Sequence, residues 1–400
     1  MPDSDRDAYE PDRVDSVTEV TTQSWGSRLG GGLWSILFGL LLVVVTGVVL
    51  FWNEGRAVDT ANSLTEGASS VIAIQASPVI AANDGKLVHL SGPTASSQDI
   101  VDADLGVAAK GLALKRTVEM YQWVEKSTSE TRKSVGGSDE TVTRYTYDRA
   151  WSTSTTASSG FKEPRGHENP SFPNLGGTTI YARDATLGGF ALNERILAGL
   201  STSDAPTISA SAGQRAAEYF GKRTTLTPGT IYAGANPGSP QVGDIRITYA
   251  VAPNAPISVV AKQSQATLAP YATRNGREIL LVSAGVQDPA TMFAGAQSAN
   301  VIVTWVVRVL GILGMLFGFR MMLNLLSVIG DVIPFIGDII GIGAWFVAIA
   351  CTLVVAPIII AVAWLVARPL VALGAIAVAI AAMVGMRLLS RRSPARVATA

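Results

Sequence analysis

Cysteine and histidine are almost absent from this chain, which has one cysteine and two histidines among its 400 residues. Cys351 lies in a long apolar stretch, so the polar part of the chain cannot form a disulfide and has to be stabilised by burial alone. His89 and His167 lie far apart, and neither belongs to a His-x-x-x-His or cysteine-containing zinc motif. We therefore expect neither a metal ion nor a cofactor.

The chain also lacks an excess of charge of either sign. Its 31 lysines and arginines balance 31 aspartates and glutamates, so no broad basic field indicates a nucleic-acid partner. Motifs of catalysis are missing too, because no Gly-x-Ser-x-Gly elbow, Walker loop or dinucleotide fingerprint appears between a strand and a helix. These absences predict that the protein is not an enzyme and does not bind nucleic acid.

Apolar residues, in contrast, are abundant and make up 48% of the chain. A helix needs ~20 mostly apolar residues to cross a hydrocarbon core of ~30 Å. Four stretches meet this length and predict a multi-pass membrane protein with one transmembrane helix followed, much later, by three more. The four predicted spans are residues 30–52, 301–326, 340–366 and 369–389.

Arginines near the span ends predict the orientation, because lysine and arginine in short flanks mark the cytoplasmic side. Residues 390–400 form a basic tail, and Arg320 lies near the turn between the second and third spans. Both termini should therefore be cytoplasmic. Residues 1–29 would form an acidic, disordered tail, and residues 53–300 a large extracytoplasmic or luminal domain.

Two aspartates, Asp331 and Asp338, interrupt the otherwise apolar residues 327–339. Pro334 lies between them and breaks a helix, which predicts an interfacial turn. Ionisable groups at membrane depth are costly and often functional, so a transporter subunit using both aspartates is one alternative. The favoured interpretation is two carboxylates that reach water at the turn, because no other acid lies within the four spans to form a relay.

The outer domain shows apolar and polar residues in alternation, which predicts an α+β domain with a mainly antiparallel sheet. Its most informative segments are residues 118–125 and 143–151, in which the aromatic residues share the odd positions and therefore one face. Such aromatic pairs stabilise a sheet by ~0.2–1 kcal/mol each, and a ligand platform is the alternative. The predicted antiparallel pairs are Glu119 with Arg149, Tyr121 with Tyr147, and Trp123 with Tyr145.

His167 is followed by Glu168 in a loop rich in polar groups. A histidine beside a glutamate can act as a general base, so an envelope enzyme with its active site near His167 and Glu168 is a further alternative. The other interpretation is a histidine that orders the turn through its ring nitrogens. A cleft joining His89, Glu119 and His167 would favour the enzyme. The candidate binding residues are Glu119, Tyr121, Trp123, Tyr145, Tyr147, Arg149 and His167.

Several short segments occur in an order that is similar to one known family. They include Asn53-Glu54-Gly55-Arg56-Ala57, Gly166–Ser171, Val242–Arg246 and Arg368-Pro369-Leu370. In this set the chain resembles the transmembrane protein 43 family, also called LUMA. The resemblance implies one plus three transmembrane helices, a large luminal domain and no catalytic residues. Animal members reside in the endoplasmic reticulum and inner nuclear membrane and associate with emerin and lamins.

The arginine and alanine usage indicates a bacterial member, for which the location would be the cell membrane. We expect a scaffold or assembly protein of the envelope that binds other membrane or envelope proteins through its outer domain and helps to organise the membrane. Its helices could also form a homo-oligomer, because small residues permit close helix contact. The small residues are Gly311, Gly314, Gly318, Gly341 and Ala344.

Overall fold

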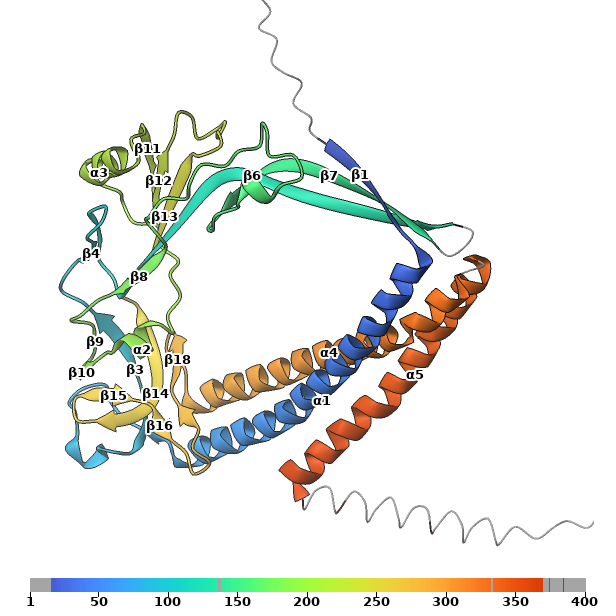
Figure 1. Cartoon of the computed structure of the whole chain (residues 1–400). Coiled ribbons are helices and arrows are strands. Elements are labelled where there is room, and N and C mark those ends of the chain that lie inside the picture. Colours follow the sequence, from blue (N-terminus) through green and yellow to red (C-terminus); the bar gives the residue numbers. More distant parts are fainter. Residues whose placement is uncertain (1–15, 135–137, 332–333, 370–373, 375–383, 385–400) are drawn as a thin grey trace, which may run out of the picture.

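Three long helices and two β-sheets form an open ring in the computed structural model, which describes residues 16–134, 138–331, 334–369, 374 and 384 (Figure 1). Three helical segments have the length and composition needed to cross a membrane: Trp25–Ser70, Pro289–Gly330 and Gly337–Ala367. They belong to α1 (Trp25–Ser70), α4 (Pro289–Gly330) and α5 (Pro334–Ala367). The predicted fourth span, 369–389, and the basic tail fall almost wholly outside the described residues.

The helices extend beyond the predicted spans at both ends. Ser24 and Asp288 cap α1 and α4, each accepting a hydrogen bond from a backbone N–H three residues later, as such residues commonly do at helix starts. Because α1 continues to Ser70 and α4 begins at Pro289, the domain between them is shorter than the predicted 53–300 and comprises about residues 71–288. The predicted turn 327–339 is also shorter, since α4 continues to Gly330 and α5 begins at Pro334.

Two seven-stranded, mainly antiparallel sheets form the domain, as the alternation predicted. Strand β8 (Thr178–Tyr181) adds to β6 (Ala113–Lys133) in the first sheet, and β14 (Pro256–Ser264) also pairs with β3 (Leu87–Ala95) in the second. The first sheet has the order β1 (Ser16–Gln23), β7 (Asp139–Ser152), β6 (Ala113–Lys133), β13 (Ile245–Ala252), β12 (Thr230–Ala233), β11 (Thr224–Thr227). The second has the order β18 (Leu281–Ala284), β14 (Pro256–Ser264), β15 (Thr267–Ala269), β10 (Phe190–Ala191), β9 (Thr186–Leu187), β3 (Leu87–Ala95), β2 (Ile72–Ala73).

One continuous apolar core connects the two sheets and includes Leu90, Leu112, Met120, Phe190 and Tyr249. The remaining small elements lie at its edges. They are the strand pairs β4 (Ile100–Asp102) with β5 (Val107–Ala109) and β16 (Tyr271–Ala272) with β17 (Glu278–Ile279), and the helices α2 (Glu194–Leu197) and α3 (Ala210–Phe220).

The long hairpin of β6 and β7 has the predicted aromatic face but not the predicted register. Tyr121 lies opposite Trp151 and Trp123 opposite Arg149, whereas Tyr147 lies opposite Glu125. Strand β6 continues through residues 127–133, which are rich in serine, threonine and charged side chains, and pairs with β7 as far as Lys133 opposite Asp139. Relative to the predicted pairs, the residue opposite each position of β6 is four positions later in β7, as Trp151 in place of Tyr147 opposite Tyr121. An even shift keeps the aromatic residues on one face.

The prediction of a disordered N-terminal tail over residues 1–29 is wrong for its second half. Residues 16–23 form β1, which pairs antiparallel with β7 from Ser16 opposite Thr146 to Gln23 opposite Asp139, and α1 begins at Trp25. This ladder also conflicts with the predicted orientation, which placed residues 16–23 and 139–146 on opposite sides of the bilayer. Hydrogen-bonded strands lie on one side.

The predicted small-residue stripe is used for packing within the chain. A Cβ atom at Gly311, Gly314 or Gly318 would lie only 2.6–2.8 Å from side-chain atoms of α1, those of Leu50, Thr46 and Val43. The glycines thus allow α1 and α4 to approach closely, as small residues do in membrane helices. These three glycines therefore face α1.

The β1–β7 pairing predicts that the N-terminal segment and the hairpin share one side of the membrane. In a Cys351→Ser background, we expect cysteines placed at the exposed positions Thr18 and Ser129 to react with an impermeant maleimide from the same side of sealed vesicles. Detergent-treated vesicles give the total labelling of each variant. Labelling of the two positions from opposite sides would show that the ladder does not form in the membrane.

The close contact of α1 with α4 predicts that Gly39→Ala destabilises the helices. The new Cβ would lie 2.6 Å from the backbone oxygen of Gly318 and 2.9 Å from the nitrogen of Met322, neither of which can move aside. We expect a loss of about 1–3 kcal/mol in detergent unfolding. Gly30→Ala in the same helix is the control, because its Cβ would meet no atom within 4 Å. Equal stability of the two variants would contradict the packing.

Candidate functional site

Three of the predicted binding residues, Trp123, Tyr147 and His167, form one aromatic cluster on the hairpin. The ring of His167 stacks on Tyr147, with centroids 3.9 Å apart, and meets Trp123 edge-on at 4.8 Å. The Arg149 guanidinium lies 5.2 Å from the centre of the Trp123 ring. The sequence therefore identified residues that do come together, although none of the predicted cross-strand pairs is present.

The other predicted residues belong to neighbouring contacts. Glu119 forms an ion pair of 2.8 Å with Arg246 on β13 instead of Arg149. Tyr121 packs against Trp151 with ring centroids 5.2 Å apart, and the Arg246 guanidinium lies 4.4 Å from the Trp151 ring.

The end of the aromatic face near β1 is held by carboxylates. Tyr145 donates a hydrogen bond of 3.1 Å to Glu19 on β1, and Tyr147 donates one of 2.8 Å to Glu125. Burial and this bond to Glu125 raise the pKa of the Tyr147 hydroxyl. The hydroxyl is therefore a structural donor at neutral pH.

A loop that follows β7 covers the aromatic cluster. The Asn169 side chain accepts a bond of 2.7 Å from the backbone N–H of Trp123 and donates one of 2.9 Å to its carbonyl. The pairing of β13 with β6 ends at Met120, so these two side-chain bonds take the place of the backbone hydrogen bonds that a neighbouring strand would form with Trp123. His167 is fully buried, with Nδ1 3.0 Å from the carbonyl oxygen of Glu163. The cluster is thus interior, not an open platform.

The cleft that would have favoured an enzyme does not bring His89, Glu119 and His167 together. His89 lies on β3 in the second sheet, where its Nε2 is 2.8 Å from the carbonyl oxygen of Gln287. Glu119 pairs with Arg246 in the first sheet, and Glu168 is exposed beside the buried His167. Each group has its own structural contact.

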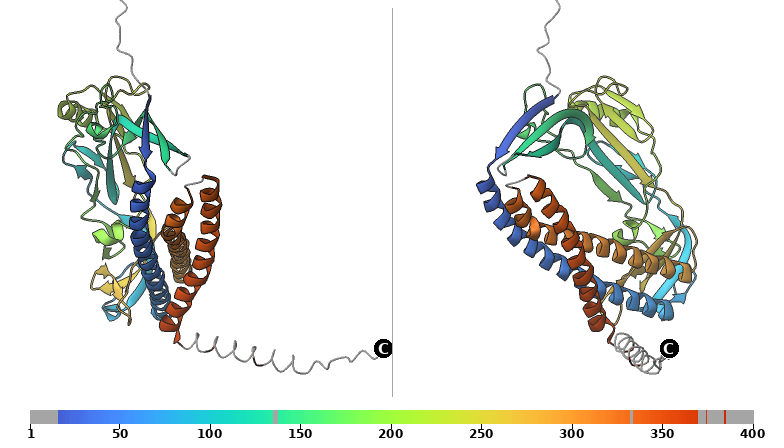
Figure 2. Two further views of the ribbon diagram at one scale, coloured as in Figure 1. Left: turned by 45° about the vertical axis from the view of Figure 1, so that its right-hand side comes forward. Right: turned by 90° about the vertical axis from the view of Figure 1, so that its right-hand side faces the viewer.

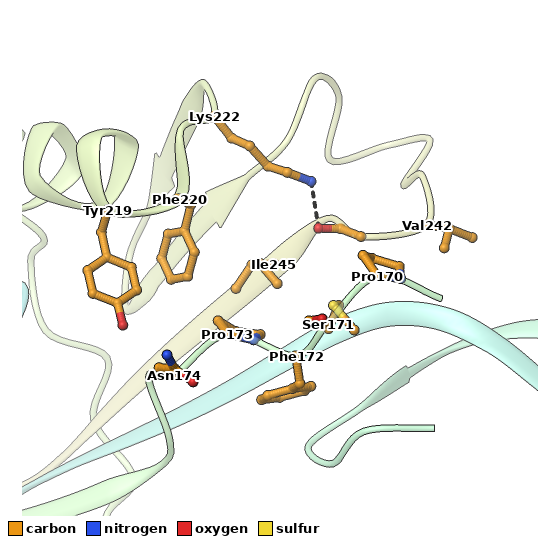
Figure 3. Close-up of a pocket in the computed structure, with 12 residues that line it drawn as sticks. Pro170, Ser171, Phe172, Pro173, Asn174, Tyr219, Phe220, Lys222, Val242 and Ile245 are labelled. Carbon is orange, nitrogen blue, oxygen red and sulfur yellow. Dashed lines mark hydrogen bonds between the residues drawn. The ribbon is translucent and has the colours of Figure 1, made fainter. Parts of the chain in front are cut away.

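The domain does have an open groove, at the end remote from α1 and α4 (Figure 1), and its lining is drawn in Figure 3. It has a volume of about 600 Å³ and lies between the loop at residues 170–174, the end of α3 and the start of β13. Phe172, Tyr219 and Phe220 give it an aromatic wall. Lys222 donates a hydrogen bond of 2.5 Å to the carbonyl of Gly243 and connects two of these segments.

A charged cluster lies where the apolar parts of α1, α4 and α5 end, and we call Glu54, Arg308 and Trp364 the three-helix junction. Arg308 donates two hydrogen bonds of 2.6 Å to the two oxygens of Glu54, and the Trp364 indole N–H donates one of 2.7 Å. Glu54 is 1% exposed. The sequence analysis did not predict this site. The pattern that could have indicated it is an acid, Glu54, and a base, Arg308, near the ends of successive apolar segments.

A second charged cluster joins the hairpin turn to the opposite helix ends, and we call it the hairpin clasp. Arg28 binds Asp139 at 2.9 Å and Asp331 at 2.5 Å, while Lys133 binds Asp331 at 2.8 Å and Asp338 at 2.9 Å. The sequence predicted that both carboxylates reach water, and the Asp338 side chain is 64% exposed. The same prediction is wrong for Asp331, which is 1% exposed because it binds both bases.

Comparison with known proteins identifies the family. A model described as Transmembrane protein 43 matches residues 120–369. Transmembrane protein 43 of Homo sapiens is 30% identical over 368 residues, which cover 87% of each chain. The chain belongs to the transmembrane protein 43 family. The Mus musculus protein is 29% identical over 374 residues, 88% of this chain and 90% of its own length.

A more distant animal relative supports the same family assignment. The Transmembrane protein 43 homolog of Drosophila melanogaster is 29% identical over 350 residues, 84% of this chain and 90% of its own length. No solved structure matches the chain significantly. The transmembrane protein 43 family model covers the aromatic cluster, the groove and two of the three junction residues, Arg308 and Trp364. As a member of this family the chain is a membrane protein.

The bonds of Asn169 predict that Asn169→Ala destabilises the domain. The backbone N–H and carbonyl of Trp123 would lose their partners at a buried site, which costs about 1–3 kcal/mol per unsatisfied group. Asn174→Ala, at an exposed position in the same loop region, is the control. Urea unfolding in detergent, followed by tryptophan fluorescence, measures both. A stability of Asn169→Ala equal to that of the control would contradict this role.

Proposed function

We propose that the chain is a non-catalytic membrane scaffold whose two-sheet domain binds a protein partner. The main observation in support of this proposal is that the candidate catalytic groups are already engaged in structural contacts. His89, Glu119 and His167 are each engaged in a separate structural contact, and His167 is buried beneath its own loop. The surface that we propose for partner binding is the groove at the end of the domain remote from α1 and α4.

The composition of the groove supports a protein as the occupant. Aromatic residues are enriched in the centres of protein interfaces, where a few of them supply most of the binding free energy. Tyr219 is 48% exposed and packs edge-on against Phe220, with centroids 4.9 Å apart. Its ring is thus held in place before a partner arrives, which lowers the entropic cost of binding.

In this proposal the helices anchor the scaffold in the membrane. Residues 369–389 would add a fourth apolar helix to α1, α4 and α5, and the protein would lie in the cell membrane if the source is bacterial. The domain is joined to the membrane through both α1 and α4, so it has no single flexible tether. A domain held at two points suits the organisation of envelope proteins at a fixed distance from the bilayer.

A single substitution in the groove tests the scaffold role. We expect Tyr219→Ala to reduce recovery of the proteins that co-purify with the wild type in mild detergent by at least about tenfold, because a central aromatic contact contributes about 2 kcal/mol or more. Val286→Ala, which is 73% exposed and lies outside the groove, is the control.

Quantitative mass spectrometry of the three preparations gives the measurement, and their unfolding temperatures establish that each variant is folded. The proposal requires the same partners to be kept by the control and lost by Tyr219→Ala. An identical set of partners for all three proteins would contradict the groove as the binding surface.

A further inference from the structure

The three-helix junction carries an unbalanced positive charge. Arg56, Arg308 and Arg368 all lie at this end of the apolar helix segments, and among the described residues only Glu54 forms an ion pair with any of them. Arg56 instead donates to uncharged partners, the Asn300 amide oxygen at 3.1 Å and the Thr304 hydroxyl at 3.0 Å. Three guanidinium groups thus lie at this end of the helices, and of these only Arg308 is paired with Glu54 in the described part of the chain.

A pocket of about 200 Å³ opens beside this charge. It is lined by residues of all three helices, among them Arg308, Trp364 and Arg368. Arg308 gives Nε and Nη2 to Glu54, which leaves its third nitrogen, Nη1, available to a ligand. The Arg368 guanidinium lies 5.8 Å from the Trp364 ring and forms no ion pair within the described part of the chain. The pocket therefore offers donors for an anion.

A further polar group faces the same pocket without a partner. The side-chain oxygen Oε1 of Gln297 is buried and has no hydrogen-bond partner among the described residues. An unsatisfied buried oxygen costs about 1–3 kcal/mol. Because this oxygen is covered, the side chain has to turn toward the pocket to meet a ligand hydroxyl, which pairs with the amide in either orientation since a hydroxyl both donates and accepts. The pocket thus fits an anion that also carries a hydroxyl.

The position of the pocket indicates that the anion is part of a lipid headgroup. Trp305 and Trp364 line it and are partly exposed, and tryptophan is enriched at the level of lipid headgroups. Along α1 the exposed side chains change there from apolar, as at Phe51 and Trp52, to polar. A group bound at this depth lies among lipid headgroups. Basic pockets between membrane helices are suited to such headgroups.

We propose that the pocket beside the three-helix junction binds the headgroup of an anionic phospholipid. The phosphate contacts Arg308 and Arg368, and a headgroup hydroxyl contacts Gln297. The acyl chains lie along the exposed apolar faces of α4 and α5. This site is separate from the groove and does not depend on the scaffold role.

Dioctanoyl phosphatidylglycerol is the probe, because its headgroup has both a phosphate and hydroxyls. It is titrated into the whole purified protein in a neutral detergent, and the unfolding temperature is followed. We expect a saturable increase, since a ligand that binds the folded state raises stability with concentration. Dioctanoyl phosphatidylcholine and inorganic phosphate should each give no saturable increase. An equal effect of phosphatidylcholine or of inorganic phosphate would overturn an anionic lipid as the ligand.

Arg368→Gln tests the residue assignment. Removing a charged hydrogen-bond donor should weaken the apparent affinity for phosphatidylglycerol about tenfold or more. The substitution leaves the Glu54–Arg308 pair intact, so the protein should fold. Arg165→Gln makes the same charge change at a side chain that is 95% exposed in the outer domain, and it should bind as the wild type does. Wild-type affinity in Arg368→Gln, or an equal loss in both variants, would refute the site.

Discussion

The antiparallel contact between α1 and α4 is the constraint on which the rest of the structure depends. Apart from β1, the two-sheet domain is inserted between these helices, with the chain leaving α1 at Ser70 and entering α4 at Pro289. Close approach needs glycine on both sides, and the backbones of Gly39 and Gly318 meet with no room for a Cβ atom. The same contact continues into the domain, where Gly67 of α1 fits against Phe293 of α4.

Two charged clusters mark the ends of the apolar part of this helix pair. Arg28 of the hairpin clasp and Glu54 of the three-helix junction are separated by about 26 residues of α1, or about 39 Å of helix. That length exceeds a hydrocarbon core of ~30 Å and approaches the ~40–45 Å of a bilayer with its headgroups. Buried charges are costly unless they are paired, and here each pair lies at a depth where water and headgroups begin.

The sequence predicted the face of the hairpin but not its register, for a physical reason. Alternation specifies which side chains share a face, while the turn specifies which residues are opposite, and residues 127–133 resemble a loop in composition. Their hydroxyls instead pair across the strands, as Ser129 does with Thr143 and Thr131 with Thr141, both at 2.9 Å. Glu119 then meets Arg246, a residue 127 positions away that no local pattern could indicate.

The other differences from the sequence predictions also involve partners distant in the chain. Residues 16–23 contain Val17 and Val20 among threonines, a strand signal, but their partner strand lies about 120 residues later. The glycines of α4 were recognised as a contact surface, whereas the identity of the facing helix requires the fold. Asp331 looked like a group free to reach water until Arg28 and Lys133 were brought to it from two other elements.

The polar hairpin constrains how the ring can be placed relative to a bilayer. Residues 126–133 of β6 are all exposed, mostly charged or hydroxyl-bearing, and extend about 26 Å at ~3.3 Å per residue. The hairpin reaches from the domain across the open ring from the helices and meets the helix ends at the clasp (Figures 1 and 2). Its backbone edge and charged side chains need water, since unsatisfied polar groups in hydrocarbon cost several kcal/mol each. The hairpin side of the ring therefore has to lie in water and not in hydrocarbon.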